Sequence, residues 1–169
     1  MIGVDHKYLN VILIFFLMLS LSACADNADI MVVKAKSNKT AMKLDVFKSP
    51  TCECCGRWVN HIDSLGFKAV IHHPLDLSGV KQKLGVAPQY QSCHTGVSKE
   101  GYIFEGHIPA EVMQRFLAER PKNALGLAVP GMPVGSPGME MGDRYDSYDV
   151  LLLKKDGSSQ VYERIRHKG

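Results

Sequence analysis

The chain has 169 residues, of which 46% are hydrophobic and 22% charged, and its formal net charge is +3. This length leaves room for one domain of ordinary size plus a short appendage, which excludes two large domains, and the composition excludes disorder throughout. The basic residues are scattered among the acidic ones, so nucleic acid is not an expected partner.

The first 23 residues predict a bacterial lipoprotein signal peptide. Residues 11–21 form an uncharged apolar run that is too short to span a bilayer, which needs roughly 20 residues. The run ends in Leu21-Ser22-Ala23-Cys24, which resembles the lipobox where lipid is attached to a cysteine. We therefore expect residues 1–23 to be removed, Cys24 to be lipidated and residues 24–41 to form a flexible tether. An ordinary signal peptide, with Cys24 a bystander, is the alternative.

These features predict a location on the periplasmic side of the bacterial envelope. The lipid on Cys24 would be the only contact with the membrane. Ala25 follows the cysteine in place of an aspartate, which favours the outer membrane.

Residues 42–169 predict a single α/β domain that begins with a βαβ unit. Residues 42–47 alternate as a strand, and residues 67–71 form a second strand. Between them, apolar residues from Cys55 onward recur at spacings of three and four, which predicts a helix with one buried face that ends at Gly66. A strand, a helix and a strand within about 30 residues imply parallel strands in a covered sheet.

The rest of the domain predicts two more helices, two hairpins and one long loop. Residues 126–142 are rich in glycine and proline, so no regular secondary structure is expected there. The other expected elements are a short helix at 78–84, a hairpin at 96–107, a helix at 110–120 and a final hairpin with strands at 148–153 and 160–165.

Three cysteines of the segment Cys52-Glu53-Cys54-Cys55 fall at the start of the first predicted helix. The free backbone amides there stabilise thiolate, which is the reactive and metal-ligating form. Cys52 and Cys55 have the spacing of a thioredoxin-type redox pair, but a third sulfur would compete in disulfide exchange. A cluster of thiolates selects soft ions such as Cu(I) or zinc. Structural disulfides are the alternative in an exported protein.

Cys93 and His94 can supply a sulfur and an imidazole from a distant loop. Cys93 alone could equally be a disulfide partner of the cluster. His107 could be a metal ligand, a residue that contacts a ligand without binding the metal, or a helix cap. Three further histidines are expected to be solvated, namely His61, His72 and His73. Three loop methionines could contribute a thioether ligand or pack against an apolar rim, namely Met132, Met139 and Met141.

The sequence resembles the CopG-type copper resistance proteins of Gram-negative bacteria. The similarity covers residues 42 to about 165 and rests on motifs in the family's order, namely Cys52-Glu-Cys-Cys-Gly-Arg-Trp58, Ser92-Cys-His-Thr95, Glu105-Gly-His-Ile-Pro109 and Val129-Pro-Gly-Met-Pro-Val-Gly-Ser-Pro-Gly-Met-Glu140. The resemblance implies a thioredoxin-like fold with a mixed sheet, a periplasmic location and a cluster of more than one copper ion.

Carried over by position, the sulfur ligands would be Cys52, Cys54, Cys55 and Cys93, with His94 as the best nitrogen ligand. The resemblance also implies cycling between Cu(I) and Cu(II) beside envelope copper efflux or chaperone proteins. Whether the chain is an enzyme is left open, since it could be a copper oxidoreductase or a thiol oxidoreductase. The alternative function is a thiol-disulfide oxidoreductase acting on envelope proteins.

Overall fold

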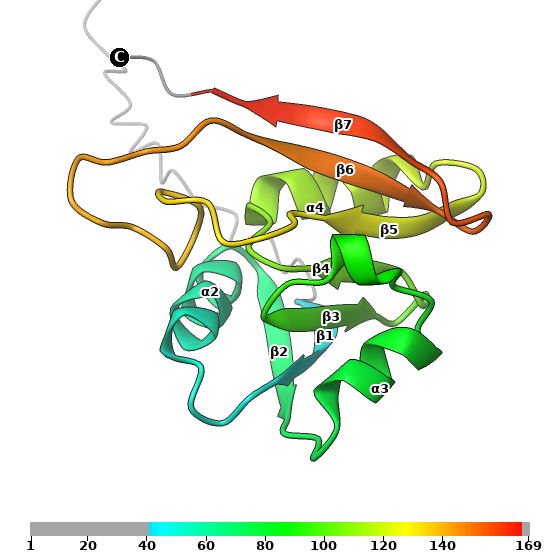
Figure 1. The fold of residues 1–169 in the computed structure, drawn as a ribbon, viewed down its shortest axis with the longest axis horizontal. Helices are drawn as coiled ribbons and strands as arrows, with labels where there is room; N and C mark the ends of the chain where they lie inside the picture. The colour runs from blue at the N-terminus through cyan, green and yellow to red at the C-terminus, as the bar shows by residue number, and fades with distance from the viewer. Residues whose placement is uncertain (1–40, 167–169) are drawn as a thin grey trace, which may run out of the picture. The chain divides into compact units, whose positions relative to one another are not determined.

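The computed structural model describes residues 41–166, so the expectations for the signal peptide, for Cys24 and for the tether up to residue 40 lie outside the described residues. The described part forms a seven-stranded sheet with helices against both faces (Figure 1). Its elements in chain order are β1 (Met42–Lys48), α2 (Glu53–Ser64), β2 (Phe67–His72), α3 (Leu77–Lys83), the 3-10 helix η1 (Pro88–Tyr90), β3 (His94–Ser98), β4 (Ile103–Glu105), α4 (Ala110–Glu119), β5 (Ala124–Ala128), β6 (Tyr148–Lys154) and β7 (Ser159–Ile165).

The sheet confirms the expected α/β class with a mixed sheet. Its strand order is β2-β1-β3-β4-β5-β6-β7. β1 and β2 are parallel and joined through α2, which is the predicted βαβ unit, and β6 and β7 form the predicted final hairpin. The order β2-β1-β3-β4, together with α2 and α4, agrees with the thioredoxin-like expectation. Within residues 41–166, no helix is both long and apolar enough to cross a membrane.

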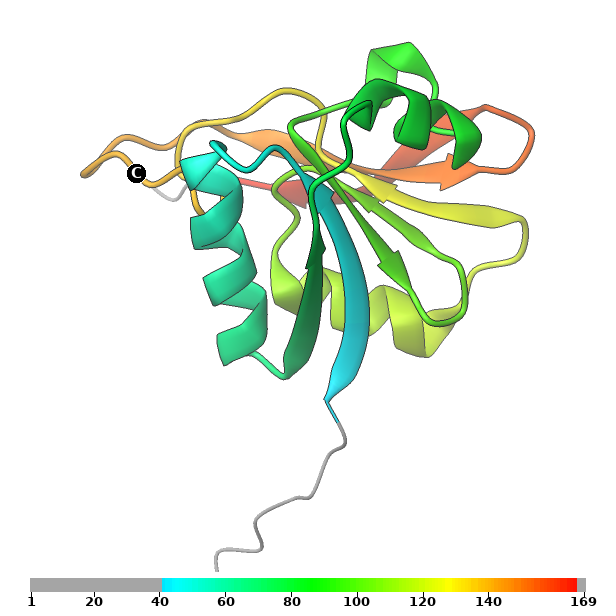
Figure 2. The same cartoon turned by 90° about the horizontal axis from the view of Figure 1, so that it is seen from below.

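The helices lie in two layers. Figure 2 shows α2 and α4 against one face of the sheet, and α3 and η1 against the other. The hydrophobic core lies under α2 and α4, where strand residues such as Leu44 and Val46 meet Trp58 and Phe116. The indole nitrogen of Trp58 donates a hydrogen bond to the backbone oxygen of Ile108 at 2.9 Å, so a polar group within this core is satisfied.

Helix α2 follows the predicted pattern closely. Cys55, Trp58 and Ile62, at spacings of three and four, are its buried residues. Gly66 follows the helix with φ of 92°, a left-handed conformation that glycine adopts without steric cost. The buried face and the end of the helix are therefore where the sequence placed them.

One expectation was wrong. Residues 126–128 do not belong to an irregular loop, because they form part of β5, which pairs parallel to β4 and antiparallel to β6. A Cβ atom on Gly126 would lie 1.8 Å from the backbone oxygen of Ile103, so this glycine permits close approach of two strands. The first hairpin lies two residues earlier than expected, because β3 begins at His94 and β4 ends at Glu105.

Candidate metal centre

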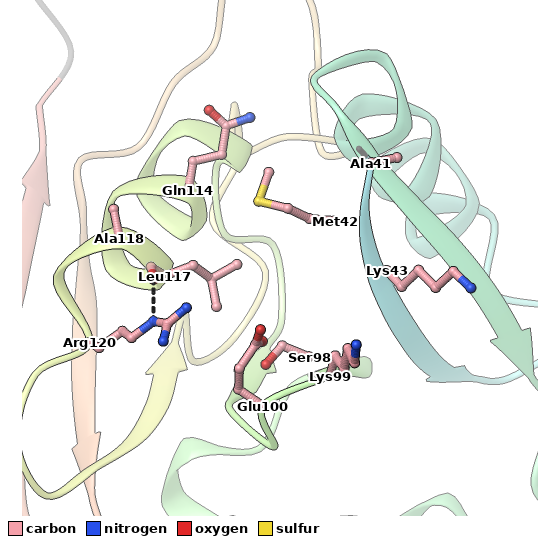
Figure 3. A pocket seen from close by; sticks show the side chains of 10 residues that line it. All are labelled: Ala41, Met42, Lys43, Ser98, Lys99, Glu100, Gln114, Leu117, Ala118 and Arg120. Atoms are coloured by element: carbon pink, nitrogen blue, oxygen red, sulfur yellow. Dashed lines mark hydrogen bonds between the residues drawn. The ribbon is translucent and has the colours of Figure 1, made fainter. Parts of the chain in front are cut away.

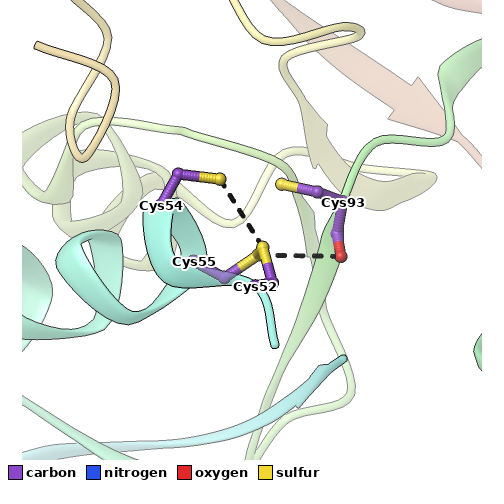
Figure 4. A group of neighbouring side chains, drawn as sticks. All are labelled: Cys52, Cys54, Cys55 and Cys93. Carbon is purple, nitrogen blue, oxygen red and sulfur yellow. Dashed lines mark hydrogen bonds between the residues drawn. A yellow bond between two sulfur atoms is a disulfide. The ribbon is translucent and has the colours of Figure 1, made fainter. Parts of the chain in front are cut away.

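Four cysteines converge where β1 ends and β3 begins. Cys52 is the N-cap of α2, and Cys54 and Cys55 lie in its first turn. Cys93 comes from the other segment and immediately precedes β3. The four Sγ atoms all lie within 4.8 Å of one another, and Figure 4 shows those of Cys54 and Cys93 directed toward each other. The sulfur atoms of the two chain segments therefore lie close enough together to share a metal ion.

The four sulfurs are in two chemical states. Cys52 and Cys55 form a disulfide, whereas Cys54 and Cys93 are free thiols. The Sγ of Cys54 lies 3.5 Å from that of Cys52. Only a thiolate can ligate a metal ion fully, so a site with four thiolates requires two-electron reduction of the disulfide.

Cys93 is held as a neutral thiol in this state. Burial, followed by the nearby Cys54, raises the pKa of the Cys93 thiol to about 12. A soft metal ion binding here would have to displace the thiol proton, because the thiolate is the ligand.

His107 joins the site through the same sulfur. Its Nε2 lies 3.0 Å from the Sγ of Cys93, and its Nδ1 lies 2.8 Å from the backbone oxygen of Pro137. A carbonyl oxygen can only accept, so Nδ1 carries the proton and Nε2 directs its lone pair at Cys93. Burial lowers the pKa of His107, which keeps the ring neutral. Metal-binding histidines are oriented in this way by a backbone carbonyl.

His94 completes a second group of donors. Its Nδ1 lies 3.3 Å from the Sγ of Cys93, and Cys93, His94 and His107 each offer a ligand atom within 4.8 Å of the others. Burial, followed by His107 and Lys81, lowers the pKa of His94, so its imidazole is also neutral. Its Nε2 is buried and has no hydrogen-bond partner among the described residues. A buried polar atom without a partner marks a place where a ligand could bind.

The other histidines in residues 41–166 lie outside these groups. His61 was expected to be solvated, but it is half-buried, and its Nε2 accepts a hydrogen bond from the backbone N–H of Ala110 at the start of α4. His72 pairs with the carboxylate of Asp45 at 2.7 Å. His73 donates from Nδ1 to the backbone oxygen of Lys48. Each has a structural partner of its own.

The loop after β5 covers the start of α2. A Cβ atom on Gly138 would lie 2.6 Å from the backbone oxygen of Cys54, and Arg57 donates to the backbone oxygen of Gly138. Met132 and Met141 of this loop are 52% and 53% exposed. The loop therefore contacts the centre through its backbone, while these two thioethers face solvent.

A cavity of about 630 Å³ lies at the opposite end of the sheet (Figure 3). It lies beside the start of β1, at Met42 and Lys43, and beside the β3–β4 turn and α4. None of the described residues that line it is a cysteine or a histidine, so it is separate from the metal centre.

The fold and the site together define an α/β protein with a cysteine and histidine cluster whose donor atoms suit a soft metal ion. Residues 90–139 match the family model described as a protein of unknown function, DUF411. Two solved structures are similar over 73% of this chain, both with a TM-score of 0.69. They are form 2 of copper resistance protein CopG, 43% identical with 98% of its chain covered, and form 1, 44% identical with 97% covered. A comparison with curated proteins found no match.

This chain therefore belongs to the CopG family of copper resistance proteins. The resemblance that the motifs predicted is confirmed.

Proposed function

We propose that this protein binds copper for copper resistance, in a centre formed by Cys52, Cys54, Cys55 and Cys93 with His94 as a nitrogen ligand. The observation that carries the proposal is the convergence of four sulfurs from two chain segments within 4.8 Å. Two solved relatives named copper resistance protein support copper as the ion. Thiolate and imidazole donors suit Cu(I), and imidazole also suits Cu(II).

His107 is added to this ligand set. Its lone pair faces Cys93, and its other nitrogen is held by a backbone carbonyl. Two donor groups that share Cys93 can hold more than one ion, since a thiolate sulfur can bridge two metals. The centre is accordingly proposed to be multinuclear.

The disulfide gives the centre a way to cycle copper between oxidation states. Reduction of the Cys52–Cys55 disulfide takes up two electrons and two protons. Oxidation of two Cu(I) ions to Cu(II) releases two electrons, so the two half-reactions balance. Envelope copper efflux or chaperone proteins would supply or receive the ions. The proposed location is the periplasmic side of the envelope, with the chain lipid-anchored through Cys24.

The test is copper stoichiometry of reduced protein purified without oxygen. Elemental analysis should give more than one copper per chain for the wild type and less for Cys54→Ser and Cys93→Ser. His107→Ala should bind Cu(I) more weakly than the wild type, whereas His73→Ala, a matched change outside the centre, should not. Wild-type copper content in Cys93→Ser would remove that residue from the site.

The Cys52–Cys55 disulfide favours one second candidate, a thiol-disulfide oxidoreductase. Cysteines with this spacing at the start of a helix are typical of such enzymes. Insulin reduction separates the two functions. Full reductase activity in protein that binds no copper would establish the oxidoreductase, whereas copper binding without reductase activity would exclude it.

A further inference from the structure

A charged network is buried directly behind the metal centre. The ammonium group of Lys81, on α3, lies 2.5 Å from Oε1 of Glu105 and 2.8 Å from the hydroxyl of Thr95. The Thr95 hydroxyl donates to Oε2 of Glu105 at 2.6 Å. Lys81 is 3% exposed, and Thr95 and Glu105 are fully buried. These three residues are called the Lys81 network below.

Stability alone is a weak reason for a buried ion pair. Removing two charges from water is costly, and a protein with well-packed apolar residues of similar volume in their place is often as stable or more stable. Lys81, Thr95 and Glu105 are not among the proposed copper ligands, so direct metal binding does not explain why they are buried together. Its connections to the rest of the chain therefore indicate its role.

The network is connected to the chain on both sides of the proposed ligands. Oε1 of Glu105 also accepts a hydrogen bond from the backbone N–H of Ser92, the residue before Cys93, at 2.6 Å. Thr95 follows His94 directly. Glu105 ends β4 two residues before His107. One carboxylate thus links the segment that carries Cys93 and His94 to the segment that carries His107.

The network and the His94 ring lie on opposite faces of the sheet. Thr95 and Glu105 are direct cross-strand partners, and Lys81 reaches them from α3, which covers one face (Figure 2). His94 points to the other face, where its ring lies 4.2 Å from the ring of Trp58 on α2. Successive strand residues alternate between faces, so the network can fix the backbone without occupying the metal centre.

We infer that the Lys81 network is a positioning device for the metal centre, which holds Cys93 and His94 at a fixed separation from His107. This inference rests on the proposed copper function. Lys81, Thr95 and Glu105 are positioning residues, because they act through the backbone of the ligand segments. Mutation of a group that orients a metal ligand typically lowers the metal affinity by about 10–100-fold.

The decisive variant replaces the ion pair by apolar side chains, Lys81→Met with Glu105→Leu. An apolar pair leaves no unpaired buried charge, so the variant should still fold. The Thr95 hydroxyl and the Ser92 N–H lose their partners, so its melting temperature should fall moderately. The Ser92 N–H loses its acceptor, so Cu(I) should bind about 10–100-fold more weakly. Cu(I) alone is titrated into reduced protein against a competing chelator, and the thiolate-to-copper absorption should also change.

A second pair of variants keeps the inference testable if that double variant fails to fold. Thr95→Val removes the hydroxyl and should weaken Cu(I) binding, whereas Thr95→Ser keeps it and should restore wild-type binding. Arg115→Gln, which breaks an exposed ion pair with Glu163 on α4 and β7, is the control and should bind Cu(I) normally.

The outcomes separate this inference from the function on which it rests. Wild-type Cu(I) affinity and absorption in a folded double variant, or equal affinities for Thr95→Val and Thr95→Ser, would overturn the positioning role and leave the copper function intact. A wild-type protein that binds no Cu(I) would overturn both.

Discussion

Replacing Trp58 by phenylalanine should destabilise the domain by about 2–4 kcal/mol. Trp58 is fully buried, and its Nε1 donates to the backbone oxygen of Ile108, next to His107. Phenylalanine leaves that acceptor unsatisfied, which costs about 1–3 kcal/mol. Phenylalanine is also smaller than tryptophan, and the void that it leaves adds roughly 1 kcal/mol. For a domain of this size, the melting temperature should fall by roughly 8–16 °C.

The assay is thermal unfolding of the metal-free, oxidised protein followed by circular dichroism. Tyr162→Phe is a matched control, because it also removes one polar group from an aromatic side chain, but from an exposed hydrogen bond with Glu119. This control should melt within about 2 °C of the wild type, as surface substitutions usually change stability by less than 0.5 kcal/mol. A Trp58→Phe protein that melts with the control would refute the role assigned to the indole N–H.

Three further predictions concern the centre and its cover. The chain has a single tryptophan, so Cu(I) binding beside Trp58 should quench the intrinsic fluorescence, and an unchanged emission spectrum would place copper elsewhere. Gly138→Ala should lower the melting temperature more than Gly131→Ala: both glycines have positive φ, but only at Gly138 would the new Cβ meet the backbone of α2, at 2.6 Å. Alkylation mapped by mass spectrometry should label Cys52 and Cys55 only after dithiothreitol treatment; labelling without reductant would contradict the disulfide.

Most of the fold could be predicted because its elements have clear apolar periodicity. The spacing of Trp58 and Ile62 predicted the buried face of α2, and the alternation in residues 42–47 predicted β1. β5 was missed for a tertiary reason. Gly126 is disfavoured in a strand by local propensity, and only the contact with Ile103 on the neighbouring strand explains why glycine is required there.

The candidate site could be predicted only as far as its residues are neighbours in sequence. The three sulfurs of α2, and Cys93 beside His94, are local motifs. His107 could not be assigned, because its orientation comes from the backbone oxygen of Pro137, far along the chain. The Lys81 network was missed for the same reason. Nothing in the composition of a short polar helix indicates that its lysine is buried against a glutamate 24 positions away.

Strand direction explains why all these residues meet at one end of the sheet. β1 and β3 are antiparallel, so the end of β1 at Lys48 pairs with the start of β3 at His94. β4 is antiparallel to β3 and parallel to β5, so both of these strands end there too, where Glu105 pairs with Ala128. Each segment that contributes to the centre therefore adjoins the same end of one of four adjacent strands, β1, β3, β4 and β5.

The register of the same pairing sets the roles of adjacent residues. His94 faces Trp58 while Thr95 faces Lys81. A slip of one residue in β3 would exchange these two side chains between the faces of the sheet. It would bring the hydroxyl to the metal centre and remove the imidazole from it. The copper site proposed here thus depends on the register of β3 as much as on the identity of its ligands. The side chains of the Lys81 network meet on the side of the sheet that α3 covers, so their hydrogen bonds favour that register.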